Sequence, residues 1–143
     1  MRALPLPWKQ LTPVTLVLSS MHAKNSVMAI NRIVDVFPAE SQQQIRVQLA
    51  DNLMMVLNQR LVERKDAKSR VLTYEKLVNS YCVANQFREG KEHQIRSILQ
   101  SGSEDFSSLD MHLAQLYPSG KITKGKAMHY CRDAKAFKEL LAR

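Results

Sequence analysis

The sequence predicts a mixed α/β fold in which a few strands precede a helical part. An apolar run leads into a helical pattern, two later strand-like runs flank a charged turn, and helical spacing then dominates to the end. The segments concerned are Leu16–Ser20, residues 56–62, residues 70–78 and the chain from Asn79 onward. With 143 residues, 45% of them hydrophobic and 24% charged, the chain has the length and balance of one globular domain.

The first strand is expected at Leu16–Ser20, so that His22 stands at its carboxyl end, where open α/β sheets place their ligands and chemistry. Asn25 or Ser26 can cap the helix that follows. Pro38 ends that helix and opens the next, because proline suits a first helical turn. The apolar faces of these two helices are Val27, Ile30, Val34 and Phe37, and Ile45, Leu49, Leu53 and Val56.

The strands at residues 56–62 and 70–78 are expected to form a hairpin through the charged turn 63–69. From Asn79 onward the pattern is helical. The expected helix starts are Ser107, which with Asp110 resembles a capping box, Thr123 and Asp133, and the expected stops are Gly102 and Pro118. We therefore place a boundary near Val78, between residues 16–78 and a helical module at residues 79–143.

The net charge of +8 and the pI near 9.7 suit an anionic partner, because clustered cations gain affinity by releasing counterions. The cations form two groups, at residues 60–70 and 121–126, and neither group contains the aromatic residues that stack on bases. We therefore interpret them as solvated surface and expect no nucleic-acid partner. A basic nucleic-acid-binding domain therefore ranks last among three candidate functions for the chain.

Cysteine use and hydropathy indicate a cytoplasmic protein. Cys82 and Cys131 lack any paired spacing and are expected to be free thiols in a reducing compartment. No apolar run approaches the roughly 20 residues that span a bilayer. We expect no integral membrane segment, and a position either free in the cytoplasm or peripheral at the inner face of the membrane.

Four segments together resemble a known family: LVLSSMHAKNSVMAINRIVDVF (16–37), RVQL (46–49), FREGKEHQIRSILQSG (87–102) and SLDMHLAQLY (108–117). They are similar to the C-terminal half of the PilT-type pilus-retraction, or twitching-motility, ATPases of the type II/IV secretion ATPase superfamily. The resemblance runs from residue 16 to near the end of the chain. It implies the distal part of a RecA-like P-loop ATPase core, with few strands, followed by an α-helical C-terminal module.

The resemblance gives His22 a possible catalytic role. The family has a histidine in this position, and the resemblance implies a sensor of the γ-phosphate of bound nucleotide or an aid to hydrolysis. A structural histidine at a strand end is the alternative.

The resemblance also aligns CVANQFRE, residues 82–89, with the family's retraction motif, AIRNLIRE. Asn85, Arg88 and Glu89 match that motif, whereas Ala84 replaces its first arginine and so removes a bidentate donor. A solvated helix face is the alternative for Arg88 and Glu89.

The sequence contains no complete phosphate-binding loop. Residues 120–127, GKITKGKA, nearly match the pattern GxxxxGK[ST], but Ala127 lacks the hydroxyl that ligates Mg²⁺, and Pro118 with a helical pattern precedes the segment where a strand is needed. His93, His112 and His129 show no spacing typical of a metal site. We therefore expect no ATP, Mg²⁺ or other metal to bind this chain, although the intact family uses ATP and Mg²⁺.

These features predict a truncated, divergent retraction motor that is inactive by itself, from a family that couples ATP hydrolysis to type IV pilus disassembly as a homo-hexamer. The alternative is a helical interaction module that binds pilus or secretion-machinery subunits, or an intact paralogous motor. Residues 1–15 do not match the family, and we interpret them as a divergent leader produced by a reading-frame change; a divergent or truncated start is the alternative.

Overall fold

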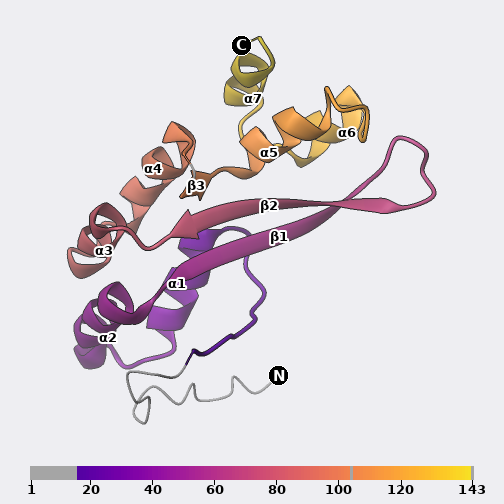
Figure 1. Cartoon of the computed structure of the whole chain (residues 1–143). Helices are drawn as coiled ribbons and strands as arrows, with labels where there is room; N and C mark the ends of the chain where they lie inside the picture. The colour runs from indigo at the N-terminus through magenta and orange to yellow at the C-terminus, as the bar shows by residue number, and fades with distance from the viewer. Residues whose placement is uncertain (1–15, 104, 143) are drawn as a thin grey trace.

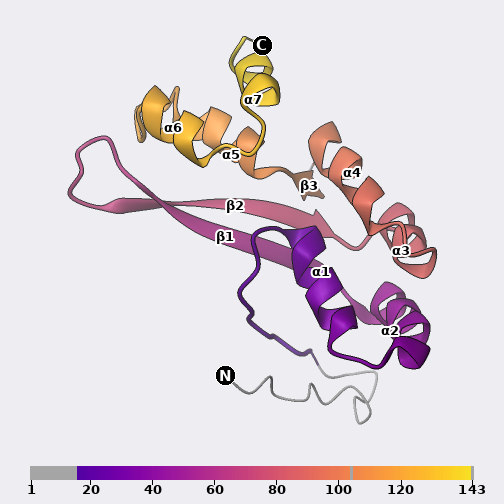
Figure 2. The same cartoon turned by 180° about the vertical axis from the view of Figure 1, so that it is seen from behind.

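The computed structural model describes residues 16–103 and 105–142 as a mixed α/β fold, which confirms the predicted class. Its sheet has three antiparallel strands in the order β1-β2-β3. Helices α1 and α2 lie below the long β1–β2 hairpin in Figure 1, and α5 to α7 lie above it. The view from behind in Figure 2 shows the same division, with α3 and α4 at the end of the hairpin away from its turn.

The hairpin consists of β1, Met55–Glu63, and β2, Arg70–Val78, which pair along their full length. The two predicted strands are therefore confirmed, and β1 is one residue longer at each end. The turn between them contains no glycine, and Ala67 adopts the left-handed conformation there with φ of 56°.

The hairpin has one buried and one exposed face, as the period of two in a strand requires. The buried face carries Val62, Thr73, Glu75 and Leu77, each at most 1% exposed. The opposite face exposes four large apolar side chains, with Leu61 directly across from Leu72. We call this set the open face: Met55, Leu57, Leu61 and Leu72.

The first core lies between one end of the hairpin and four helices: α1, Ser26–Asp35; α2, Ala39–Asn52; α3, Tyr81–Arg88; and α4, Ile95–Ser101, which follows a 3-10 turn at Glu92–Gln94. The Asn25 side chain caps α1 by accepting from the Met28 amide at 2.7 Å. The predicted apolar faces of α1 and α2 are confirmed, except that Val56 belongs to β1. Helix α2 ends at Asn52, and Leu53, which follows it, has an extended backbone but still packs against the first core. The fully buried members include Ile30, Val34, Leu49, Leu77, Val83, Phe87 and Ile95.

The second core packs Val62 of β1 against α5, Leu109–Leu116; α6, Lys124–Tyr130; and α7, Ala134–Leu141. Thr123 and Asp133 cap α6 and α7 as predicted. The predicted cap at Ser107 is wrong by one residue, because Ser107 pairs with Lys76 as part of β3, Phe106–Ser107. Ser108 caps α5 instead, and its hydroxyl accepts from the Met111 amide at 3.2 Å.

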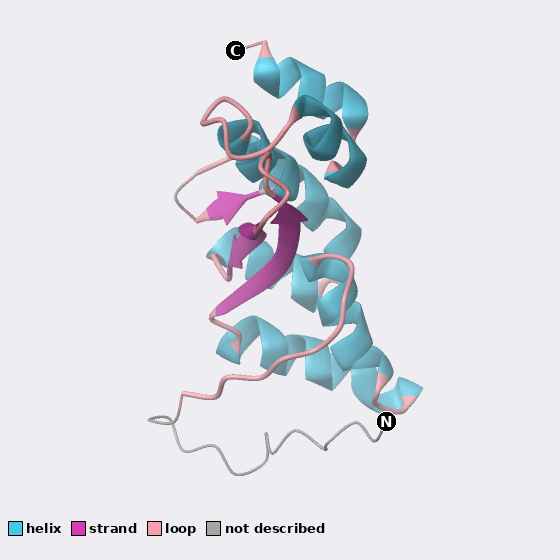
Figure 3. Cartoon of the chain, turned by 90° about the vertical axis from the view of Figure 1, so that its right-hand side faces the viewer, coloured by secondary structure: helices cyan, strands magenta, loops and turns pink. Residues whose placement is uncertain are grey.

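The predicted strand at Leu16–Ser20 is wrong: these residues form an irregular segment that runs along the outside of the fold (Figure 3). Leu16 and Leu18 are 68% and 88% exposed. A strand needs a neighbour to pair its backbone N–H and C=O groups. In the described part of the chain, β1 and β2 pair with each other and β3 with β2, and no strand pairs with this segment.

The boundary near Val78 stays a prediction, and the first core draws residues from both sides of it. The predicted origin of residues 1–15 lies outside the described residues. None of the described helices is long and apolar enough to cross a membrane.

Candidate functional site

The segment that carries His22 runs irregularly into the start of α1 and is held from outside its own element. Asn58 of β1 donates from Nδ2 to the Ala23 carbonyl at 3.0 Å. Arg132, in the connection between α6 and α7, donates from Nη2 to the Lys24 carbonyl at 2.7 Å. The His22 imidazole itself is exposed. Residues far apart in sequence therefore fix the backbone on which His22 stands.

Glu75 of β2 is the centre of this arrangement. Its side chain is 1% exposed, and its Oε1 accepts from the Ser26 amide at 2.7 Å. Its Oε2 forms an ion pair with Arg132 Nη1. A carboxylate loses its hydration when buried and is stable only when paired and hydrogen-bonded. The Glu75 carboxylate also lies at the N-terminal, positive end of the α1 dipole, which favours an anion.

Arg132 is itself placed by a second buried carboxylate, Asp110 of α5, which is 7% exposed. The Arg132 amide donates to Asp110 Oδ1 at 2.8 Å, and the Asp133 amide donates to Asp110 Oδ2 at 3.0 Å. The start of α7 is thus fixed to α5, and the Arg132 guanidinium is directed at Glu75. We call Glu75, Asp110 and Arg132 the polar clasp.

The residues predicted from the retraction motif lie on α3 and at its C-terminal cap, Glu89, and Arg88 joins α3 to α2. Arg88 donates from Nη1 to Asn85 Oδ1 at 3.1 Å and from Nη2 to Asp51 Oδ1 at 2.7 Å. Glu89 forms an ion pair of 2.8 Å with Lys91. Ala84, where the family motif has an arginine, is buried in the first core.

The structure does not bring the predicted site residues together. No hydrogen bond or ion pair within the described residues joins His22 to Asn85, Arg88 or Glu89. Their catalytic and retraction roles stay predictions. The polar clasp, which sequence reasoning missed, is the arrangement that holds the His22 segment. Its one visible signal is a glutamate at a position of β2 that alternation predicts to be buried.

The near-match to a phosphate-binding loop, residues 120–127, connects α5 to α6 and forms the first turns of α6. Thr123 caps this helix by accepting from the Lys126 amide at 3.3 Å. The element before the segment is a helix, so the strand-loop-helix context of a P-loop is missing.

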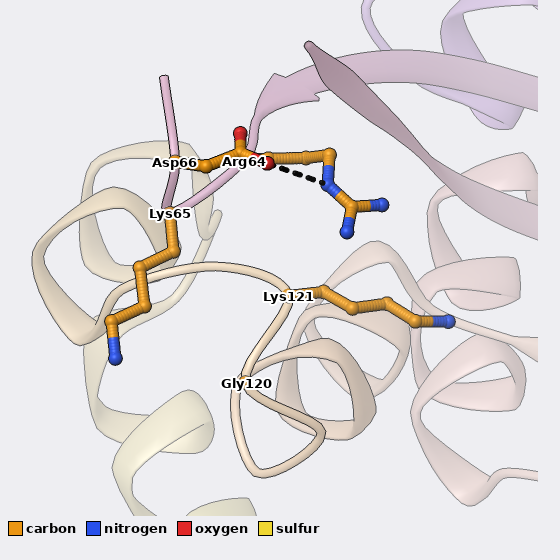
Figure 4. Close-up of a pocket in the computed structure, with 5 residues that line it drawn as sticks. All are labelled: Arg64, Lys65, Asp66, Gly120 and Lys121. Atoms are coloured by element: carbon orange, nitrogen blue, oxygen red, sulfur yellow. Dashed lines mark ion pairs between the residues drawn. The ribbon is translucent and has the colours of Figure 1, made fainter. Parts of the chain in front are cut away.

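The same connection contacts the hairpin turn. The Lys65 amide donates to the Lys121 carbonyl at 2.9 Å, and Lys126 Nζ donates to the Arg64 carbonyl at 2.9 Å. Arg64, Lys65, Asp66, Gly120 and Lys121 line an open pocket of about 410 Å³ (Figure 4). The two cation groups of the sequence therefore form one surface. We call its cations the basic tip: Arg60, Arg64, Lys65, Lys68, Arg70, Lys121, Lys124 and Lys126.

The remaining histidine and cysteine candidates do not form a metal-binding group in the described part of the chain. His112 Nδ1 accepts from the Tyr74 amide at 3.2 Å, and burial, with Lys121 nearby, holds the pKa of His112 below its usual range. Cys82 and Cys131 are free, as expected, and burial, with Asp110 and Asp133 adding to it, raises the pKa of the Cys131 thiol. Among the described residues, no three His, Cys, Asp or Glu side chains gather as metal ligands would.

Comparison with known proteins gives relatives over most of the chain, although no family profile matches it. The twitching motility protein of Neisseria gonorrhoeae is 32% identical over 122 residues, which cover 85% of this chain and 33% of that protein. The type IV pilus ATPase PilU of Pseudomonas aeruginosa is 32% identical over 120 residues, which cover 83% and 31%. The structure of the pilus retraction motor PilT with bound ADP has a TM-score of 0.72 and 33% identity, covering 83% of this chain and 33% of that one. The chain thus spans about a third of the length of these relatives.

Proposed function

Because this chain belongs to the PilT-type family of pilus-retraction ATPases and matches its C-terminal region, we propose that it acts in twitching motility by docking on motor subunits rather than by hydrolysing ATP itself. The observation that carries this proposal is the retained fold, with a TM-score of 0.72 to a retraction motor at 33% identity. The 143 residues include no complete phosphate-binding loop. Phosphoryl transfer depends on such a loop to position the phosphates.

The open face supports docking on a protein. Met55, Leu57, Leu61 and Leu72 are each between 41% and 55% exposed, and they lie on a single face of the hairpin. A row of large apolar side chains is costly in water and is typical of an interaction surface. In addition, β1 is an edge strand in the described part of the sheet, so its outer backbone groups are available to another chain.

The occupant in this proposal is a subunit of an intact PilT-type motor, in the cytoplasm or at the inner face of the membrane. The relatives that share this fold are about three times as long as the region they share with this chain, so each has further chain outside that region. Within such an assembly, His22 is the candidate for a nucleotide-sensing residue, and Asn85, Arg88 and Glu89 are the candidates for transmitting retraction. In the same proposal, the motor subunits on which this chain docks form the homo-hexamer of the family.

Two measurements test the proposal. Calorimetric titration of the purified chain with Mg-ATP is expected to give no saturable heat, and micromolar binding would contradict the claim that the chain works without its own nucleotide. Size-exclusion chromatography with the full-length PilT of Pseudomonas aeruginosa is expected to give a stable complex. If PilT and this chain elute separately at micromolar concentrations, docking on a motor subunit is wrong.

A variant pair locates the docking surface. Leu57→Asp combined with Leu61→Asp places two charges on the open face and is expected to weaken the complex by at least about 100-fold, since each buried leucine contributes about 1.5–3 kcal/mol. Val36→Asp is the control, because Val36 is an exposed apolar residue at the end of α1, outside the open face. Equal loss in both variants would exclude the open face as the contact.

A further inference from the structure

The basic tip holds most of the net positive charge of the molecule. Its eight cations are among the 21 Lys and Arg residues of the chain, whereas residues 60–70 and 121–126 include only two of the 13 acidic residues, Glu63 and Asp66. The remainder of the chain is therefore close to charge balance. The structure brings the two cation groups together through the backbone contact between Lys65 and Lys121.

The two acids of this region neutralise little of the charge. Glu63 pairs with Lys126 at 3.2 Å, and Asp66 lies 3.7 Å from Arg64 Nε. Within residues 16–103 and 105–142, the other exposed cations of the basic tip form no ion pair with a carboxylate: Lys65, Lys68, Arg70, Lys121 and Lys124. Like charges at this density repel one another, and an anionic partner relieves that repulsion.

The shape of the basic tip suits a broad anionic surface better than one small anion. The hairpin turn extends past α6 and away from the body of the fold (Figures 1 and 2). In the pocket, the side chains of Lys65 and Lys121 extend in different directions, and Nε of Arg64 faces the Asp66 carboxylate (Figure 4). A single anion cannot contact cations that diverge, but separate anionic groups spread over a surface can.

The apolar neighbours of the basic tip favour a bilayer interface. Leu61 and Leu72 lie opposite each other on the open face and are 55% and 41% exposed, and Arg70 follows on the same face. Cations beside exposed apolar side chains are what an anionic membrane surface binds, through headgroup phosphates and the acyl boundary. A nucleic-acid backbone would contact the cations alone, and residues 60–70 and 119–126 contain no aromatic side chain for base stacking.

We propose that the basic tip, together with Leu61 and Leu72, docks on a membrane surface rich in anionic phospholipid. The cations contact headgroup phosphates, and the leucine pair faces the interface. This inference shares Leu61 and Leu72 with the open face of the proposed function, but its cations are separate, and vesicle binding is measured on the chain without ATP or a motor subunit. Loss of vesicle binding and loss of the motor complex are therefore distinguishable results.

The test is co-sedimentation of the full chain with vesicles. At about 0.1 M salt, where charges are screened beyond roughly 10 Å, the chain is expected to bind vesicles of phosphatidylglycerol and phosphatidylcholine and not pure phosphatidylcholine. Lys65→Gln with Lys68→Gln is expected to weaken binding about 25-fold, since each cation near the surface contributes a factor of about five. Leu61→Ser with Leu72→Ser should weaken binding while leaving its salt dependence unchanged.

Lys135→Gln with Lys138→Gln is the matched control, because it removes the same charge from exposed positions of α7. It is expected to change binding less than about threefold. Equal loss in the two lysine pairs would overturn the inference, because net charge alone would explain binding. Failure to bind anionic vesicles would also overturn it, as would tighter binding of a DNA duplex or of an acidic polypeptide at the same salt. Circular dichroism of each variant confirms that the fold is retained.

Discussion

Arg132→Met leaves the buried Glu75 carboxylate without its cation. Removing one partner of a buried ion pair costs about 3–5 kcal/mol, because an uncompensated charge remains inside the protein. Glu75 is 1% exposed, but Arg132 is 22% exposed and the Ser26 amide still donates to Glu75. We therefore expect the lower end of the range, a decrease of about 3 kcal/mol in the free energy of unfolding.

Urea denaturation followed by circular dichroism measures this change, with the midpoint giving stability and the slope reporting whether the exposed area has changed. Glu75→Gln keeps the acceptor for the Ser26 amide and removes the charge. The double variant Glu75→Gln/Arg132→Met is therefore expected to be more stable than Arg132→Met alone. Arg96→Met is the control, because Arg96 is exposed on α4, and its effect should stay within about 0.5 kcal/mol.

The reasoning is refuted if Arg132→Met changes stability no more than Arg96→Met does. It is also refuted if the double variant loses the sum of the two single losses, because residues in direct contact should be non-additive. A structural consequence can be read in the same variants. The Ser26 amide and its neighbours at the start of α1 should exchange hydrogen faster when Arg132 no longer holds the Lys24 carbonyl.

Three further predictions concern single side chains. The pKa of His112 in the folded protein lies below its unfolded value of about 6.5. The free energy of unfolding should therefore be fully present above pH 6.5 and should fall as the pH drops through 6.5 toward the folded pKa. Urea titrations at several pH values should show a weaker pH dependence for His112→Gln. Maleimide should modify exposed Cys82 faster than half-buried Cys131, and equal rates by mass spectrometry would contradict the raised pKa of Cys131. Asn25→Ala should lower the free energy of unfolding by about 1 kcal/mol through loss of the α1 cap, whereas Asn52→Ala, at an exposed helix end, should cost less.

Features with a local cause could be predicted from the sequence. The hairpin follows from two alternating runs around a polar turn, and the caps at Asn25, Thr123 and Asp133 follow from side chains that bond amides two or three residues away. The strand at Leu16–Ser20 was wrong for a non-local reason. An apolar run forms a strand only when it pairs with a second strand, and no strand of the described sheet pairs with this run.

The polar clasp could not be predicted for the same kind of reason. Arg132 and Glu75 are 57 residues apart, and Asp110 is 22 residues from the amide it holds. Nothing in the spacing of these residues indicates a contact. The union of the two cation groups in the basic tip also escaped prediction, because it depends on how α5 and α6 return to the hairpin turn.

The β1–β2 ladder contributes side chains to both cores, Leu77 to the first and Val62 to the second. It therefore connects the two cores as one continuous element. The nine paired residues of each strand span eight steps of about 3.3 Å, a length of roughly 26 Å. A two-stranded ribbon twists more strongly than a larger sheet. A torque applied to α1–α4 should therefore reach α5–α7 as a rotation about the ribbon's long axis.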